Sequence, residues 1–155
     1  MSQTNELEIM ERIALDLEGV EESLASSFNT GAEDFNALIR PLSAAGGKRL
    51  RAQLCLLIAN AGTSVERQRI RIAEAVEMLH LATLIHDDVL DQAEIRRGEE
   101  TIHMHKGNKV AILSGDYLFA KAFQIVSEMP NMKYLQVFSH IITCLVEGEF
   151  MQMED

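Results

Sequence analysis

Three aspartates, Asp87, Asp88 and Asp91, fall within five residues near the middle of the chain. If this segment is helical, Asp87 and Asp91 are four residues apart and lie on one face, about 6 Å apart along the axis. Like charges placed this way repel each other unless a cation lies between them. Mg²⁺ is held in proteins by one or two carboxylates together with substrate phosphates, and the nearby Arg96 and Arg97 could grip the same phosphates bidentately. The spacing therefore indicates a site for a hard divalent cation and a phosphate-bearing molecule.

The alternative for these aspartates is a helix that ends in a solvated acidic turn, and the cluster alone favours that interpretation. Acidic residues at a helix C-terminus, however, oppose the macrodipole, which favours cations there. Apolar residues also lead directly into the aspartates: Met78, Leu79, Leu81, Ala82, Leu84 and Ile85. An apolar wall that ends in a cation site suggests a substrate with an apolar tail and an anionic head.

A second stretch suited to an anion is Gly46-Gly47-Lys48-Arg49-Leu50-Arg51. Its two glycines let backbone amides approach an anion closely, and the helix expected after them points its positive end the same way. Lys48 and Arg51 are three residues apart, so both can reach one phosphate group. The alternative is a glycine-rich helix start with solvated basic side chains. The spacing excludes a P-loop.

Several histidines allow further chemistry. His80 lies two turns before Asp87 on nearly the same face, so it is either a hydrogen-bonded core residue or a donor to a phosphate. His103 and His105 alternate in a polar segment, and a transition-metal site there is an alternative that the predominance of hard oxygen ligands disfavours. The pair His86-Asp87 suggests a metal-dependent phosphohydrolase, which would need further histidines on neighbouring helices.

Helices are the elements expected to position these residues. The chain has only 9 Gly and 2 Pro but 8 Met among 155 residues, which favours a nearly all-α protein. Apolar residues recur at helical spacing in six segments, and the residues at 92–108 are expected to form a polar loop. The predicted helices cover 7–28, 32–42, 52–61, 72–91, 110–129 and 132–155.

Composition limits the class of protein further. A net charge of −10 argues against nucleic acid or an anionic membrane surface as a partner. We find no apolar run long enough to span a bilayer and no signal peptide in the acidic N-terminal segment, so we expect a cytoplasmic protein. Cys55 and Cys144 are expected to be buried thiols of a reducing compartment. Arg67, Arg69 and Arg71 are expected on a solvated face.

Taken in order, the motifs resemble those of the trans-isoprenyl diphosphate synthase (polyprenyl synthetase) family. The resemblance covers most of residues 40–155. The segments that carry it are Gly46-Gly47-Lys48-Arg49-Leu50-Arg51, Leu84-Ile85-His86-Asp87-Asp88-Val89-Leu90-Asp91, Arg96-Arg97-Gly98, Gly115-Asp116-Tyr117-Leu118, and Glu147-Gly148-Glu149 with Gln152. It implies an all-α fold, an antiparallel helix bundle around a central cavity, usually as a homodimer.

The resemblance also implies a reaction, the Mg²⁺-dependent condensation of an allylic diphosphate such as farnesyl diphosphate with isopentenyl diphosphate. Asp87 and Asp91 would bind Mg²⁺ directly, with Asp88 in support. Arg96 would hold the allylic diphosphate. The residues that would hold the isopentenyl diphosphate are Lys48, Arg51, His80 and Arg97.

Product length can be argued from side-chain size. Ala82 and Thr83 lie about one turn before the aspartates, where short-chain relatives carry aromatic rings. Their small side chains would leave room for a growing tail, and Phe119 or Phe123 on the neighbouring helix would stop it. We therefore expect a medium or long product, hexaprenyl to octaprenyl rather than farnesyl.

The family has a second aspartate-rich motif further along the chain, and residue 155 precedes it. We therefore expect a single α-helical domain, 1–155, that forms the N-terminal half of a synthase and has little activity by itself. Its exposed apolar surface should drive self-association. A non-catalytic helical subunit of a partner synthase is the other alternative.

Overall fold

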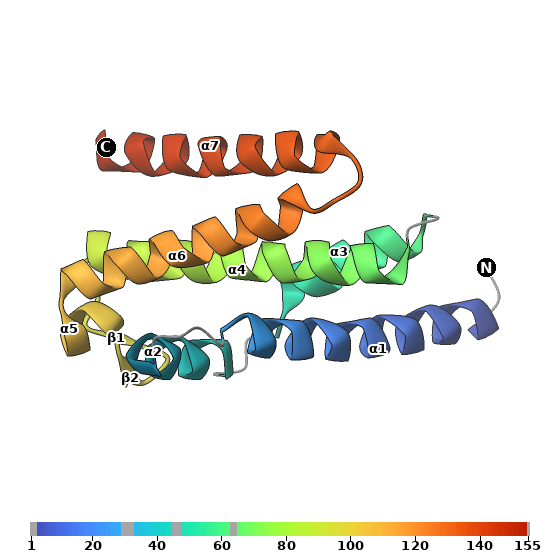
Figure 1. Ribbon diagram of the computed structural model, residues 1–155, viewed down its shortest axis with the longest axis horizontal. Helices are drawn as coiled ribbons and strands as arrows, with labels where there is room; N and C mark the ends of the chain where they lie inside the picture. The colour runs from blue at the N-terminus through green and yellow to red at the C-terminus, as the bar shows by residue number, and fades with distance from the viewer. Residues whose placement is uncertain (1–2, 29–32, 45–47, 63–64, 155) are drawn as a thin grey trace.

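The computed structural model describes residues 3–28, 33–44, 48–62 and 65–154, and every structural statement below refers to these residues. They form an all-α fold with one small hairpin (Figure 1), as predicted. The elements are α1 (Gln3–Ser27), α2 (Glu33–Ala44), α3 (Leu50–Asn60), α4 (Glu66–Leu90), β1 (Ile95–Arg96), β2 (Glu99–Glu100), α5 (Ile102–Lys106), α6 (Asn108–Ser127) and α7 (Met132–Glu154).

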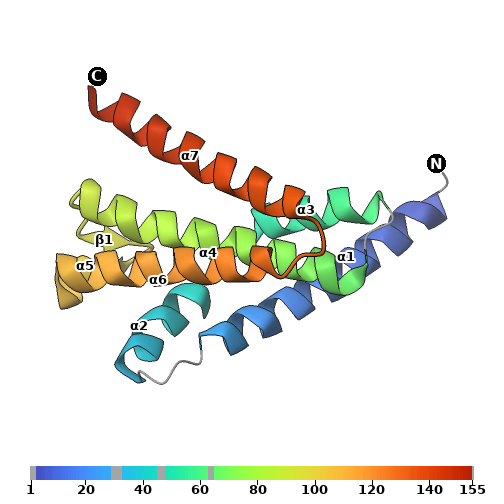
Figure 2. The same ribbon diagram turned by 45° about the horizontal axis from the view of Figure 1, so that its top comes forward.

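Helix α4 is the centre of the bundle, with α6, α3 and α1 packed against it. In both ribbon views α4 and α6 run side by side in opposite directions (Figures 1 and 2). The buried apolar side chains of α4 recur at helical spacing, and those of α6 meet them from the other side. Each fully buried Leu, Ile, Val or Met side chain among them contributes about 1.5–3 kcal/mol. They are Ala73, Ala75, Met78, Leu79, Leu81, Ala82 and Ile85 on α4, and Ala111, Leu118, Ala122, Ile125 and Val126 on α6.

The buried surface of α4 also carries charges, which corrects one prediction. Arg69 is only 8% exposed and donates from Nη2 to Oδ1 of Asp16 on α1 at 2.9 Å. Arg71 is half-buried and donates to the buried Glu74 at 2.6 Å. Of the three arginines expected on a solvated face, only Arg67 is exposed. The partner of Arg69 lies on another helix, so the local sequence carries no sign of it.

The segment expected to be a polar loop is instead a hairpin followed by the short helix α5. Ile95 pairs with Glu100, so Arg97 and Gly98 form a two-residue turn. Both have positive φ, 53° at Arg97 and 87° at Gly98, which is the backbone of a type I′ turn. This turn type matches the right-handed twist of the strands, and it fixes the direction of the arginines beside it.

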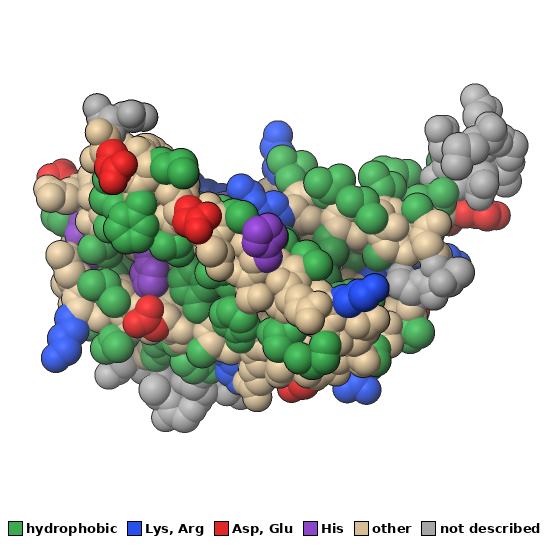
Figure 3. Space-filling model, turned by 90° about the horizontal axis from the view of Figure 1, so that it is seen from above, with side chains coloured by type: hydrophobic (Ala, Val, Ile, Leu, Met, Phe, Trp, Pro, Cys, Tyr) green, Lys and Arg blue, Asp and Glu red, His purple; other side chains and the backbone are tan. Residues whose placement is uncertain are grey.

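Helix α7 packs mainly on α6, where the ring of Phe138 meets that of Phe123 edge-on at 5.6 Å. Much of its remaining surface is apolar and exposed. Figure 3, seen from the side that carries α7, shows hydrophobic side chains spread over this face. Cys144 is exposed here, which corrects the expectation that both cysteines are buried; Cys55 is half-buried. The large exposed apolar residues of α7 are Met132, Tyr134, Val137, Ile141, Leu145, Val146, Phe150, Met151 and Met153.

Helix α6 is, within the described part of the chain, the one helix long and apolar enough to cross a membrane by length and composition, with 20 residues and a mean hydropathy of 1.2. Lys109, Asp116 and Lys121 interrupt it, so α6 is not a continuous apolar run. α6 packs along α4 in the bundle, and a core helix passes the same test, so the finding is weak evidence for a membrane span.

Candidate phosphate and metal site

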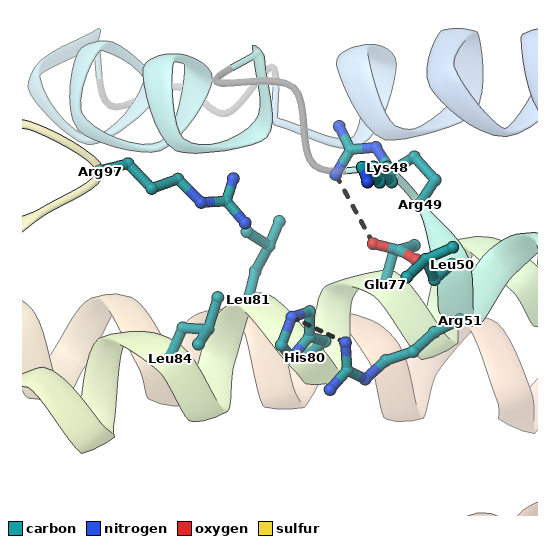
Figure 4. Close-up of a pocket in the computed structure, with 9 residues that line it drawn as sticks. All are labelled: Lys48, Arg49, Leu50, Arg51, Glu77, His80, Leu81, Leu84 and Arg97. Atoms are coloured by element: carbon teal, nitrogen blue, oxygen red, sulfur yellow. Dashed lines mark hydrogen bonds and ion pairs between the residues drawn. The ribbon is translucent and has the colours of Figure 1, made fainter.

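A pocket of about 200 Å³ lies where the start of α3, the middle of α4 and the hairpin meet (Figure 4). Basic residues reach it from three separate elements: Lys48 and Arg51 from the start of α3, His80 from α4, and Arg97 from the turn. These are the four residues that the sequence predicts to hold one diphosphate. The fold therefore brings them together across up to 49 positions of sequence, from Lys48 to Arg97. Leu81 and Leu84 supply an apolar wall.

The contact with Arg51 favours the neutral form of His80 in this pocket. Nη1 of Arg51 lies 3.1 Å from Nε2 of His80. A guanidinium has no lone pair to offer, so Nε2 must accept the hydrogen bond, which leaves the proton on Nδ1. Burial and the positive charge of Arg51 lower the pKa of His80, against an opposing effect of Glu77. A neutral ring that can gain a proton suits a site that receives an anion.

The hairpin separates its two arginines. Arg97 reaches toward the pocket, as Figure 4 shows. Arg96 turns the other way and donates from Nε to Oδ1 of the buried Asp88 at 2.6 Å. The positive φ of Arg97 is unfavourable for a residue with a Cβ, and such conformations are concentrated at functional sites. One turn thus presents one arginine to the basic pocket and the other to the aspartates.

The aspartates lie at the end of α4 as predicted. The backbone N–H of Asp91 donates to the carbonyl of Asp87 at 2.8 Å, so the two residues stack one turn apart. Asp87 is half-buried and Asp91 exposed. Burial raises the pKa of Asp87, and the charges of Glu149 on α7 and of Asp91 raise it further. The fold therefore holds an anionic carboxylate where its charge is unfavourable, and a cation would relieve this.

The carboxylates at the end of α4 suit a Mg²⁺ ion whose remaining ligands are water and substrate phosphate oxygens. In the described ranges no group of three or more His, Cys, Asp or Glu side chains converges as a protein-only metal site. Mg²⁺ needs no such group, because it keeps several waters and takes one or two carboxylates plus phosphate oxygens. Asp87 and Asp91, one turn apart at the end of α4, could provide that pair.

The histidine alternatives receive no support from the geometry. The Nε2 atom of His86 lies 3.1 Å from the carbonyl oxygen of Ile112 and 3.6 Å from Asp116 on α6. His86 thus contacts α6, and it does not converge with other histidines. His103 lies on α5, with its Nδ1 3.0 Å from the hydroxyl of Thr101.

The residues expected to set product length occupy two different environments. Ala82 has no exposed surface and lies in the core, whereas Thr83 is half-buried, one turn before Asp87 on the same face. Phe119 packs its ring 5.5 Å from that of His86, and Phe123 contacts α7. Thr83 is therefore the more accessible of the two small residues.

Two charged residues of the pocket were missed by reasoning from the sequence, Arg49 and Glu77. Both are buried. A signal was present for Glu77, because Glu74 and Glu77 are carboxylates on the face of α4 that is otherwise apolar. Buried carboxylates need partners, and this could have pointed to a buried cation. Gly46 and Gly47, expected to line the same site, lie outside the described residues.

Comparisons with known proteins agree with the motifs. Residues 32–155 match the family described as polyprenyl synthetase. Octaprenyl diphosphate synthase of Escherichia coli (strain K12) is 34% identical over 94% of this chain and 45% of its own length. Heptaprenyl diphosphate synthase component 2 of Geobacillus stearothermophilus is 38% identical over 90% of this chain and 44% of its own. The chain thus spans about half the length of these curated relatives.

Solved structures are similar over the same extent. The decaprenyl diphosphate synthase of Rhodobacter capsulatus superposes with a TM-score of 0.85 at 32% identity, over 94% of this chain and 45% of that one. A polyprenyl synthase of Caulobacter crescentus CB15, complexed with calcium and isoprenyl diphosphate, gives 0.86 at 35% identity, over 92% of this chain and 45% of that one.

Proposed function

The chain belongs to the polyprenyl synthetase family, and from this we propose that it forms the N-terminal half of a Mg²⁺-dependent synthase that joins an allylic diphosphate to isopentenyl diphosphate. The product we propose is a medium or long trans-polyprenyl diphosphate, in keeping with the octaprenyl, heptaprenyl and decaprenyl synthases to which the chain is similar. The same proposal includes a cytoplasmic location, supported by the free thiols of Cys55 and Cys144. It also includes a homodimer, supported by the exposed apolar side chains of α7.

The basic pocket is the proposed site for isopentenyl diphosphate. Lys48, Arg51 and Arg97 supply permanent positive charge, and His80 can take up a proton when the anion arrives. Each planar guanidinium group can donate two parallel, charge-assisted hydrogen bonds to the oxygens of a diphosphate. The pocket would hold the headgroup, while Leu81 and Leu84 contact the short apolar part.

The aspartate turn is the proposed site for the allylic diphosphate. Mg²⁺ bound by Asp87 and Asp91 would neutralise charge that develops on the departing diphosphate. Arg96, now paired with Asp88 at 2.6 Å, would turn part of its guanidinium to the same diphosphate. Asp88 then serves to orient Arg96. The allylic carbon–oxygen bond breaks, and its electron pair leaves with the diphosphate. The isopentenyl double bond attacks the allylic carbon, which leaves a tertiary cation. This cation loses a proton from the adjacent carbon to the released diphosphate, and a new double bond forms.

The growing tail would extend past Thr83 toward α6. The small side chain of the half-buried Thr83 leaves this route free of an aromatic ring, and Phe119 and Phe123 on α6 are the proposed stop. Apolar walls also keep water from the reacting carbon. The single observation that carries the proposal is that Lys48, Arg51, His80 and Arg97 share one pocket on the helix that ends in Asp87 and Asp91.

The test has two stages. Binding of isopentenyl diphosphate to the 155-residue chain is measured by titration calorimetry, and Arg51→Ala is expected to weaken it about tenfold or more. The gene product that contains these residues is then incubated with labelled isopentenyl diphosphate, farnesyl diphosphate and Mg²⁺, and the products are sized. Elongation that is lost in Asp87→Ala supports the proposal. Release of phosphate without elongation would support a phosphohydrolase instead.

A second candidate is a non-catalytic helical subunit that stabilises a partner synthase. One observation bears on it: a relative that is 38% identical is named as component 2 of a heptaprenyl diphosphate synthase, so a similar protein is part of an assembly with more than one component. Binding of substrate without elongation, by the chain alone and by the gene product, would support this candidate.

A further inference from the structure

Arg49 also lines the pocket, but its guanidinium is held by carboxylates. Its backbone is left-handed, with φ 46° and ψ 36°. Its side chain is 7% exposed, and it holds Glu21 of α1 with two bonds, 2.6 Å from Nε and 3.1 Å from Nη2. Its Nη1 is also 3.6 Å from Oε2 of Glu77 on α4, the contact dashed in Figure 4. Arg49 therefore ties the start of α3 to two neighbouring helices.

Glu77 is the one carboxylate among the residues that line the basic pocket. It is 3% exposed, and its Oε1 accepts a hydrogen bond from the backbone N–H of Ala52 at 3.0 Å. The residue before α3 provides no side-chain cap of its own, so Glu77 caps the first turn of α3 from a different helix. One of the amide groups at the positive end of α3 therefore already donates to a carboxylate.

A carboxylate in a phosphate pocket lowers the affinity for anions through its charge, because like charges repel. Its presence calls for a compensating effect, and the hydrogen bond to Ala52 supplies one. Arg49 and Glu77 hold the chain in place at the start of α3, and Lys48 and Arg51 belong to this same segment. If the start of α3 were free, both long side chains would have to be ordered when the anion binds.

We propose that Glu77, with Arg49, is a positioning residue for diphosphate binding: it caps α3 from α4 and so holds Lys48 and Arg51 over the pocket before the anion arrives. The inference rests on the proposed function of the pocket. Neither residue contacts the diphosphate. The guanidinium of Arg49 is held by Glu21 and Glu77, so it acts as a tether rather than a further phosphate ligand.

The experiment separates the hydrogen bond of Glu77 from its charge. Inorganic pyrophosphate is titrated into the 155-residue chain and into Glu77→Gln and Glu77→Ala. Glutamine keeps an acceptor for the N–H of Ala52 and loses the charge, so its affinity should equal or exceed that of the wild type. Alanine loses the cap, and its affinity should fall about tenfold. Equal or tighter binding by both variants, or equal weakening of both, would overturn the proposal.

The matched control is Glu74→Ala. Glu74 is also a buried carboxylate of α4, but it is bound by Ser23, Ser27 and Arg71, away from the pocket. This variant should lose stability and keep the wild-type affinity for pyrophosphate. A loss of affinity equal to that of Glu77→Ala would mean that the effect is general loosening of the bundle, and the proposal would fail.

Glu77→Asp replaces Glu77→Ala if the alanine variant does not fold. Aspartate keeps the charge but is one methylene too short to reach Ala52, so this variant should bind pyrophosphate about tenfold more weakly. Unchanged binding would count against the cap. Hydrogen exchange of the Ala52 amide should be faster in the Ala or Asp variant and unchanged in Glu77→Gln. A wild-type chain that binds no pyrophosphate would overturn the function proposed for the pocket, while the exchange rates would still decide whether Glu77 caps α3.

Discussion

Arg51 on α3 donates a hydrogen bond from Nη1 to Nε2 of His80 on α4 over 3.1 Å. The two side chains come from different helices, and their contact places a permanent cation beside a titratable ring. Burial and this cation hold the pKa of His80 below its usual range. The pocket is therefore poised to gain a proton together with an anion.

Pyrophosphate should raise the pKa of His80, because its negative charge stabilises the imidazolium form. The Nε2 and Nδ1 resonances of His80, followed by ¹⁵N NMR over a pH series, should show titration at higher pH in the presence of pyrophosphate. Arg51→Gln should raise the same pKa without any ligand. The exposed ring of His140 on α7 is the reference, and equal movement of both rings would speak against a site at His80.

Asp87→Asn should weaken binding of pyrophosphate in the presence of Mg²⁺ by at least about tenfold, as for the loss of other metal-site groups. Removal of Mg²⁺ with a chelator should reduce wild-type binding to the level of the variant. Calorimetry with and without Mg²⁺ measures both effects. Glu94→Gln, an exposed carboxylate before the hairpin, is the control. Equal loss in the control would show a general effect of charge, not a metal site.

Thr83→Phe should shorten the product, because Thr83 is half-buried one turn before Asp87 on the face that carries the site. Ala82→Phe is the informative contrast. Ala82 is fully buried, and a phenyl ring there overpacks the core at a cost of about 1–3 kcal/mol. Radiolabelled products of the gene product that contains these residues are sized by chromatography. An unchanged product distribution in Thr83→Phe would remove the steric basis for the proposed chain length.

Gly115→Ala should destabilise the chain by about 1–3 kcal/mol. A Cβ at Gly115 would lie 2.9 Å or less from three atoms of the His86 ring, which is held against α6. The double variant His86→Ala, Gly115→Ala should lose less than the sum of the single changes, since the clash is gone. Urea denaturation gives the free energies of unfolding.

The matched control for this prediction is Gly148→Ala on α7. A Cβ there meets nothing within 4 Å, so alanine in the helix interior should stabilise by about 0.5–1 kcal/mol. A loss of stability at Gly148 as large as that at Gly115 would contradict the role of the His86 contact.

The ion pair between Asp16 and Arg69 should make stability depend on pH. Burial raises the pKa of Asp16, but hydrogen bonds from Arg69 and Asn60 outweigh it and leave the pKa below the usual 3.8. A carboxylate with a lowered pKa contributes stability above that value and loses it as the pH falls through the folded-state pKa. Asp16→Asn should cost about 3 kcal/mol at pH 7 and much less near pH 2. Urea denaturation at both pH values tests this, and a constant difference would contradict it.

The sequence determined the features that depend on neighbours along the chain. Helical periodicity fixed the helices to within a few residues at most ends; the start of α4 lies six residues earlier than expected, at Glu66. The stacking of Asp87 and Asp91 also follows from their spacing, since residues four apart share a helical face. The ordered motifs identified the family because they preserve residue types at fixed distances.

Only the tertiary structure decided which distant side chains meet. Arg69 is buried, and not in solvent as expected, because it donates to Asp16 on α1. Arg49 links α3 to α1 and α4 because Glu21 and Glu77 lie beside it. The hairpin turn sent Arg96 to Asp88 and Arg97 to the pocket. Ion pairs and caps between elements depend on positions in space that chain packing sets, and the spacing of residues along one helix carries no information about them.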